Sequence, residues 1–203
     1  SSDVCSSDLL EPAPQGGEFA AREVELQGAE LGDEIAVAAG GVGLILTQMA
    51  KRLGARVIGT VGSEPKAELA RAHGCDHVID YGKEDVAARV RALTGSEGVP
   101  AVFDAVGKDT FEASLQSLMV RGTLVSYGTA SGPVPPFNIF ELNPRGSLYV
   151  TSAGLAWYTR SRTELLARAS DLVGQVATGA LHLHLHGLAR VHGQAGQPVV
   201  LGG

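Results

Sequence analysis

Short apolar runs rich in Val, Ile and Leu alternate along this chain with segments of roughly ten residues whose apolar positions have helical spacing. The runs predict strands at 34–39, 56–60, 77–80, 101–104 and 123–126. The intervening segments predict helices at 42–53, 65–73, 85–93 and 109–118. Strands that alternate with helices form right-handed βαβ units, which give a parallel sheet covered on both faces. The pattern therefore predicts an α/β fold with a doubly wound parallel sheet.

The ends of the chain differ from this alternating part. Residues 1–30 repeat Ser-Ser-Asp and are then rich in Pro, Gly and Glu, so they are predicted to be a linker or a non-native segment. A proline-rich stretch at 131–136 predicts a loop, and 147–151 has strand composition. We expect an ordered domain at 31–186 and an irregular tail at 187–203. The domain's last helix, at 162–176, has one apolar side: Leu165, Leu166, Ala169, Leu172, Val173 and Val176.

A glycine cluster joins the first predicted strand to the first predicted helix. Its spacing is Ala38-x-Gly40-x-x-Gly43, in which alanine replaces the first glycine of the dinucleotide fingerprint. The helix that follows has Val42, Ile45, Met49 and Leu53 on one face. In this strand–turn–helix context the glycines let main-chain N–H groups approach a pyrophosphate at the helix N-terminus. A plain turn is the alternative, because glycine clusters also serve that purpose.

Composition narrows the function classes. The 203 residues carry a net charge of −6 with scattered basic residues, which argues against nucleic acid as the main partner. No apolar run reaches the roughly 18 to 20 residues of a membrane span, so no membrane role is expected. Cys5 and Cys75 have no partners at metal-ligand spacing and cannot form a disulfide framework. With no secretory signal pattern at the N-terminus, we expect a cytoplasmic protein.

Six segments, spaced consistently along residues 32–186, carry a family resemblance. They are 38–43, 48–55, 59–66, 76–81, 103–111 and 143–151. Together they resemble the quinone oxidoreductase (zeta-crystallin-like) branch of the medium-chain dehydrogenases. The resemblance implies a Rossmann-type domain that binds NADPH, reduces a quinone or enone without zinc, and forms a homodimer through Ser147–Thr151. The family's N-terminal GroES-like catalytic domain is absent from this sequence, and 187–203 do not resemble the family's closing helix and strand.

The resemblance also implies which residues contact the cofactor. Gly40, Gly41, Val42 and Gly43 would supply main chain to the pyrophosphate, and Gly62, Ser63, Lys66 and Tyr81 would surround the 2′-phosphate. The remaining contacts would come from Val106, Gly128, Ala130, Ser131, Gly132 and Tyr158. Each has a structural alternative: turn geometry for the glycines, a solvated surface position for Lys66 and packing for the two tyrosines.

Two other groups of residues suggest chemistry. As a strand, His182, His184 and His186 would share one face, yet no Cys or carboxylate joins them at metal spacing and their alternation with leucine also fits a half-buried strand. We therefore predict no metal site. Asp104, at a strand end, is either a catalytic acid or, more commonly for such a position, a capping or ribose-binding residue.

The main hypothesis is the NADPH-binding part of a zinc-independent quinone or enone oxidoreductase. No catalytic residue is predicted, because that half of the cleft would come from the absent domain. One alternative is a non-catalytic module that binds NADPH as a sensor or interaction domain. Another is the enoyl reductase domain of a larger synthase, which would use the same residues.

Overall fold

The computed structural model describes residues 34–38 and 40–183, and these form one parallel sheet of six strands. The strand order is β3-β2-β1-β4-β5-β6, and every neighbouring pair is parallel. The strands are β1 (Glu34–Ala38), β2 (Arg56–Val61), β3 (His77–Asp80), β4 (Val99–Asp104), β5 (Leu118–Ser126) and β6 (Tyr149–Ser152). This is the order of the Rossmann fold, and it confirms the predicted doubly wound sheet.

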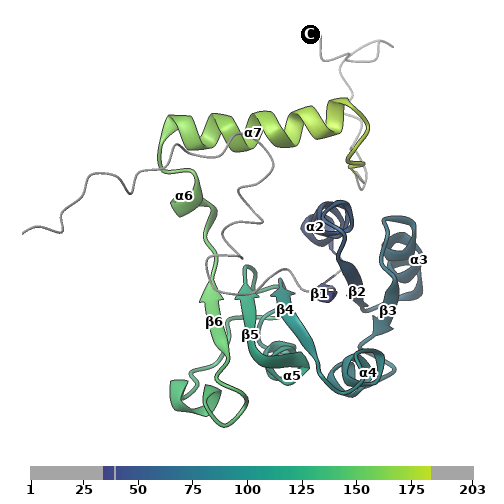
Figure 1. The fold of residues 1–203 in the computed structure, drawn as a ribbon, viewed down its shortest axis with the longest axis vertical. Helices are drawn as coiled ribbons and strands as arrows, with labels where there is room; N and C mark the ends of the chain where they lie inside the picture. The colour runs from purple at the N-terminus through teal and green to yellow at the C-terminus, as the bar shows by residue number, and fades with distance from the viewer. Residues whose placement is uncertain (1–33, 39, 184–203) are drawn as a thin grey trace, which may run out of the picture.

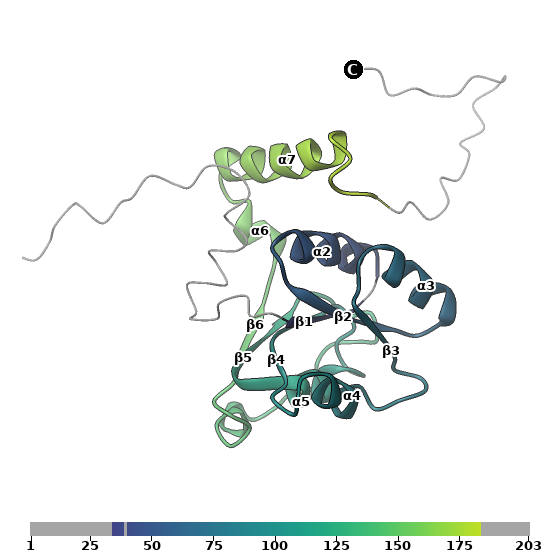
Figure 2. The same cartoon turned by 45° about the vertical axis from the view of Figure 1, so that its right-hand side comes forward.

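Helices cover both faces of the sheet (Figures 1 and 2). The first face carries α2 (Gly41–Arg52) and α3 (Glu64–Ala72), and the second carries α4 (Val86–Leu93) and α5 (Phe111–Ser117). Each face has its own apolar core. Ile35, Val57 and Ala101 pack with α2 and α3 on one side, whereas Ile58, Val102 and Leu124 pack with α4 and α5 on the other. Successive side chains of a strand point to opposite faces of the sheet, so neighbouring residues such as Val57 and Ile58 belong to different cores.

The ends of the helices agree with their local sequence. Asp85 caps α4 by accepting a hydrogen bond from the N–H of Ala88 at 2.9 Å, and Pro65 occupies the first turn of α3. Gly54 and Gly74 follow α2 and α3 with φ values of 89° and 102°, which favour glycine. The predicted boundaries of the domain at 31 and 186, and the predicted segments at 1–30 and 187–203, lie outside the described residues.

The buried face of α2 differs from the prediction. Val42 and Leu53, expected on the apolar face, are 63% and 51% exposed. The residues that α2 buries are Gly43, Leu44, Thr47, Gln48 and Ala50. Thr47 and Gln48 can be buried because both have side-chain partners, and these polar residues make the buried face less hydrophobic than the predicted one. Thr47 Oγ1 lies 3.7 Å from Cys75 Sγ, and Gln48 Nε2 donates to the carbonyl of His182 at 3.0 Å.

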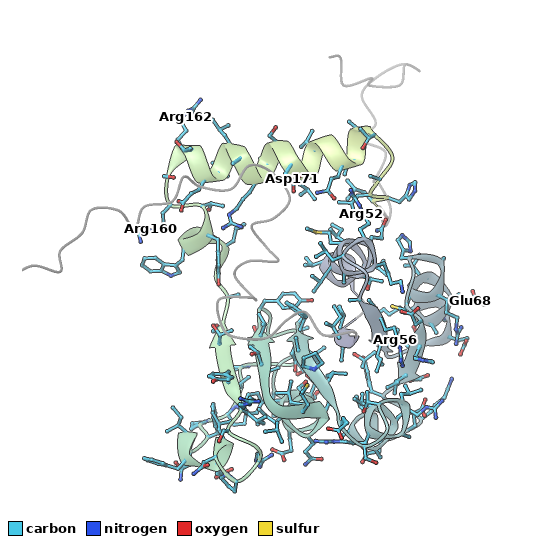
Figure 3. All side chains as sticks on the ribbon, in the orientation of Figure 1. Arg52, Arg56, Glu68, Arg160, Arg162 and Asp171 are labelled. Carbon is cyan, nitrogen blue, oxygen red and sulfur yellow. The ribbon has the colours of Figure 1, made fainter. Side chains whose placement is uncertain are left out.

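After β5 the chain passes through a short 3-10 helix, η2 (Ile139–Leu142), to β6 at the edge of the sheet. It then forms α6 (Leu155–Tyr158) and the predicted amphipathic helix, α7 (Arg162–Ala177). A capping box between Ser161 and Glu164 starts α7. Its C-terminal end docks on α2, where Arg52 Nη1 donates to Gln175 Oε1 at 2.6 Å (Figure 3).

Most of the apolar side of α7 is exposed in the described part of the chain. None of the residues of α7 is buried, and Leu165, Leu166, Leu172 and Val173 are exposed. On the neighbouring α6, Trp157 is 74% exposed. Figure 1 shows α7 set apart from the sheet, with α6 between it and the end of β6. The amphipathic pattern was therefore interpreted correctly as a helix, but its apolar face is not used by the core described here.

Candidate functional site

The strand order reverses between β1 and β4: the chain adds β2 and β3 on one side of β1, and β4, β5 and β6 on the other. The connection from β1 leads to α2 on one face, and the connection from β4 leads to α5 on the opposite face. In open α/β sheets the crevice at this reversal is where ligands bind. A groove of about 700 Å³ opens there. The groove is lined in part by Gly40, Thr60, Gly62, Lys66, Tyr81, Val106, Asp109, Thr110, Ala130 and Ser131.

The turn between β1 and α2 has glycines that the fold itself does not require. Gly40 has φ −110° and ψ −166°, which any residue can adopt, and Gly41 is not in the left-handed region either. A Cβ built on Gly40 or on Gly41 meets no atom within 4 Å. Both residues are exposed. The space above them is therefore open to a ligand that approaches the main chain closely.

The start of α2 favours a negatively charged ligand. No side chain caps Gly40 and no acidic residue lies in the first turn. The N–H groups at a helix N-terminus and its positive dipole end attract phosphate, and α2 is 12 residues long. Of the other residues predicted here, Val42 is exposed beside the turn, whereas Gly43 is buried within α2.

The second wall of the groove comes from the ends of β2 and β3. Tyr81 follows β3, and its N–H donates to the carbonyl of Val61 at 3.0 Å. Its hydroxyl lies so close to Gly62 that a Cβ at Gly62 would collide with it. Gly62 is therefore needed for the position of Tyr81, whose side chain is 48% exposed at the groove. Lys66, in the first turns of α3, also lines the groove, and no described residue pairs with it.

Glu64 is the carboxylate that could compete for a ribose at the end of β2, and it is engaged elsewhere. Its carboxylate forms ion pairs with Arg71 at 3.2 Å and with Lys83 at 3.5 Å. It is not part of the groove lining. Ser63 is the N-cap residue of α3, where its side chain makes no capping hydrogen bond, and it also lies outside the lining.

Two loops, after β4 and after β5, form the third wall and are hydrogen-bonded to each other. Ser131 is central: its N–H and its hydroxyl donate to the carbonyl of Val106 at 2.8 and 2.9 Å. The Ser131 hydroxyl also accepts from the N–H of Asp109 at 3.0 Å. Gly128 is needed for this packing, because a Cβ there would lie 2.5 Å from the carbonyl of Ala105. Ser131 thus holds the wall together rather than offering a free hydroxyl.

The structure does not bring every predicted residue to the groove. Gly128 and Gly132 support the two loops from behind, and Gly132 accepts a hydrogen bond from the N–H of Lys108 at 3.1 Å. Tyr158 lies on α6, where the guanidinium of Arg168 is 5.6 Å from the ring centroid, and it is not part of the lining. Its predicted cofactor contact stays a prediction.

Several lining residues were not predicted. Thr60, Asp109, Thr110, Glu112, Ala113 and Gln116 line the groove together with Glu84, Asp85 and Val86. Most come from the start of α4 or from α5 and the loop that precedes it. The sequence could have indicated them, because they follow the ends of predicted strands in a βαβ pattern, and the segments after such strand ends meet at one edge of the sheet.

Two titratable groups in or beside the groove have shifted pKa values. Hydrogen bonds from Arg145 and from Gln116 lower the pKa of Glu112, which keeps its carboxylate ionised. Burial raises the pKa of Tyr127, and the negative charge of Asp104 raises it further. Asp104 itself is buried, and both of its carboxylate oxygens accept hydrogen bonds from the loop and from α5. This supports the capping interpretation of Asp104 over the catalytic one.

The metal hypothesis finds no support in the described residues. Within 34–38 and 40–183 no three His, Cys, Asp or Glu side chains are grouped as metal ligands. His182 is not in a strand, and His184 and His186 lie outside the described residues. Across the same residues, no helix has the length and apolar character that crossing a bilayer requires.

The fold and the groove define a doubly wound α/β protein of the dinucleotide-binding class. The family model for zinc-binding dehydrogenases matches residues 41–171, more than half of the 203 residues, and the chain belongs to this family. The described residues offer no site for the zinc in the family's name.

Relatives place the chain in the quinone oxidoreductase branch of the family. A quinone oxidoreductase of Salmonella typhimurium is 49% identical over 144 residues, which cover 71% of this chain and 44% of the relative. A 2-haloacrylate reductase of Burkholderia is 46% identical over 149 residues, which cover 73% of this chain and 45% of the relative. The crystal structure of Escherichia coli quinone oxidoreductase complexed with NADPH superimposes with a TM-score of 0.75 at 38% identity, covering 86% of this chain and 54% of that one. The chain thus spans about half the length of these relatives.

Proposed function

We propose that this chain binds NADPH as the cofactor-binding part of a quinone or enone oxidoreductase. The observation that carries the proposal is the β1–α2 turn: Gly40 lines the groove, and a side chain on Gly40 or on the neighbouring Gly41 would meet only open space. The NADPH complex of the Escherichia coli relative supports the choice of cofactor. When bound, the nicotinamide supplies the hydride, and the chain holds and orients the cofactor.

In this proposal different residues of the groove bind different parts of the cofactor. The glycine turn and the N-terminus of α2 hold the pyrophosphate. Gly62, Lys66 and Tyr81 surround the 2′-phosphate, with Ser63 at the end of β2 beside them. The paired loops after β4 and β5 form the opposite wall. NADPH is preferred over NADH because Lys66 adds a cation, while the carboxylate of Glu64 is held by Arg71 and Lys83 and does not line the groove.

The acceptor is proposed as a small molecule with a carbon–carbon double bond conjugated to a carbonyl group. Quinones and 2-haloacrylates share this feature, and they are the substrates named for two of the relatives. A hydride added to the conjugated carbon leaves an enolate-type oxygen that must be protonated. The open β1–α2 turn equally supports the alternative function, a sensor module that binds NADPH without turnover.

The exposed apolar residues of α6 and α7 support a second element of the proposal. Exposed Leu155, Trp157, Leu166 and Val173 make a surface that a working enzyme would cover. We propose that the part of the relatives' length that this chain does not span packs there and completes the substrate pocket.

The chain alone is therefore expected to bind NADPH but not to turn over. Calorimetry should show a saturable 1:1 complex, while NADPH oxidation with a simple benzoquinone should not exceed the uncatalysed rate. Turnover in the usual enzyme range of ~1 to 10³ per second would contradict the second part. A chain that binds neither NADPH nor NADH would contradict the proposed function itself.

A homodimer through the edge of the sheet is also proposed. The predicted segment Ser147–Thr151 includes most of β6, which in the described part of the chain pairs with β5 on one side only. Exposed strand edges invite pairing with a second chain, and a lysine on the edge discourages it. Tyr149→Lys is expected to shift a dimer to monomer in sedimentation. Val173→Lys, on exposed α7, is the control and should leave the dimer intact. A wild-type chain that is monomeric at high concentration would contradict this proposal.

A further inference from the structure

Asp104 ends β4 directly beneath the groove, and its carboxylate is almost completely buried, at 3% exposure. Its partners are neutral donors. Oδ1 accepts from the N–H of Val106 at 2.7 Å and from the N–H of Gly107 at 3.1 Å. The hydroxyl of Thr110 lies 2.9 and 2.8 Å from the two oxygens, and the hydroxyl of Ser114 donates to Oδ2 at 2.8 Å. A buried carboxylate without a cation is costly unless such bonds satisfy it.

Most of these donors belong to the wall of the groove. Val106 and Thr110 line it, and Gly107, between them, has a φ of 88°. The Gly107 carbonyl in turn accepts from the N–H groups of Thr110 at 3.0 Å and Phe111 at 2.9 Å, which starts α5. Through the Val106 carbonyl, the loop after β5 is attached to the same structure. One side chain is therefore linked to both loops.

We propose that Asp104 is a positioning residue for dinucleotide binding, which forms the wall at Val106 and Gly107 before the ligand arrives. The inference rests on the proposed function, since the ligand is the same cofactor. Asp104 does not contact the ligand, because its oxygens lie beneath the loop and are occupied by protein donors. Without it, binding would have to order the loop, and fixing even one main-chain residue costs about tenfold in affinity.

The role depends on the acceptor geometry and not on the charge. An asparagine at this position offers the same Oδ1 to the N–H groups of Val106 and Gly107. Its amide nitrogen would replace Oδ2, where the hydroxyls of Thr110 and Ser114 can accept instead of donate. Asp104→Asn should therefore recover most of the binding that Asp104→Ala loses, which separates positioning from an electrostatic effect.

The test is calorimetric titration of the full chain with NADPH and with NADH. Asp104→Ala should raise the Kd of both cofactors about tenfold and leave their ratio unchanged, because the loop contacts are common to both. Asp104→Asn should stay within about threefold of the wild type, less than the value of one typical hydrogen bond. Ser114→Ala removes only the donor from α5, so it should lower the melting temperature without changing either Kd. If Asp104→Ala does not fold, Thr110→Val, which removes the loop's own hydroxyl donor at the same volume, should raise both Kd values instead.

The outcomes separate the inference from the proposed function. A wild-type chain that binds neither cofactor overturns both. A wild-type chain that binds, with an Asp104→Ala variant that melts earlier but keeps the wild-type Kd, overturns the positioning role alone. An Asp104→Asn variant as weak as Asp104→Ala also overturns it, because the charge and not the geometry would then matter.

Discussion

Lys66→Ala is expected to weaken NADPH binding about ten- to a hundredfold and to leave NADH binding nearly unchanged. A charge-assisted hydrogen bond between a lysine and a phosphate is worth roughly 1.5 to 3 kcal/mol, which corresponds to that factor. Lys66 lines the groove beside Gly62 and Tyr81, and no described residue pairs with it. A lysine in the first turns of a helix gains nothing from the helix dipole. Titration of both cofactors against both proteins by calorimetry measures the effect.

Lys83 offers a matched control for the loss of one positive charge. It lies near the same end of the sheet but pairs with Asp80 at 3.0 Å and with Glu64 at 3.5 Å, and it does not line the groove. Lys83→Ala should change the Kd of NADPH by far less than Lys66→Ala does, because Arg71 still pairs with Glu64 at 3.2 Å. Equal losses for NADPH and NADH in Lys66→Ala would show that Lys66 does not recognise the 2′-phosphate.

The sheet and the position of the groove could be predicted from the sequence because they depend on local patterns. Buried parallel strands are continuous apolar runs, and the residues at 57–60 and 101–104 show this plainly. The glycine turn marks the crevice because topology places it at the reversal of strand order. The strand composition of 147–151 likewise indicated β6, which lies at the edge of the sheet.

Other features could not be predicted because they depend on partners distant in the sequence. The residues that α2 buries are not the apolar stripe that its spacing predicted, and the polar ones find distant partners: Thr47 contacts Cys75 and Gln48 bonds to His182. Gly62 looks like an ordinary strand-end glycine until the hydroxyl of Tyr81 is placed against it. The exposure of the apolar side of α7 could not be predicted either, because periodicity shows that a face is apolar but not what covers it.

Arg91 is the clearest such case, because in the sequence it is an ordinary helix arginine. In the structure its guanidinium donates five hydrogen bonds to four main-chain carbonyls. Nη1 reaches Ser96 and Glu97 at 2.9 and 3.0 Å, Nε and Nη2 reach Gln116 at 3.2 and 3.1 Å, and Nη2 reaches Leu118 at 2.8 Å. Arg91 thus joins the end of α4, the turn before β4 and the junction of α5 with β5.

Arg91→Ala is therefore expected to destabilise the chain by about 3 kcal/mol. Hydrogen bonds to a charged group contribute roughly 1.5 to 3 kcal/mol each, but bonds that share one side chain are not additive. The turn that loses its support is a demanding one, since Ser96 has a φ of 76° and Gly98 a φ of 84°. For a chain of this size the melting temperature should fall by roughly 6 to 12 °C, at 2 to 4 °C per kcal/mol.

Two further variants make the thermal measurement specific to the geometry of the guanidinium. Arg91→Lys should recover only a part of the loss, because a lysine is a point charge that cannot fork to carbonyls on both sides. Arg89→Ala, on the same helix, removes an exposed ion pair with Glu84 at 3.7 Å and should cost less than about 1 kcal/mol. If the Arg91→Ala and Arg89→Ala variants had the same melting temperature, or if Arg91→Lys restored full stability, the four carbonyls would not need the planar guanidinium. The junction of α4, β4 and α5 would then be held by packing around Val90, Leu115 and Leu118 alone.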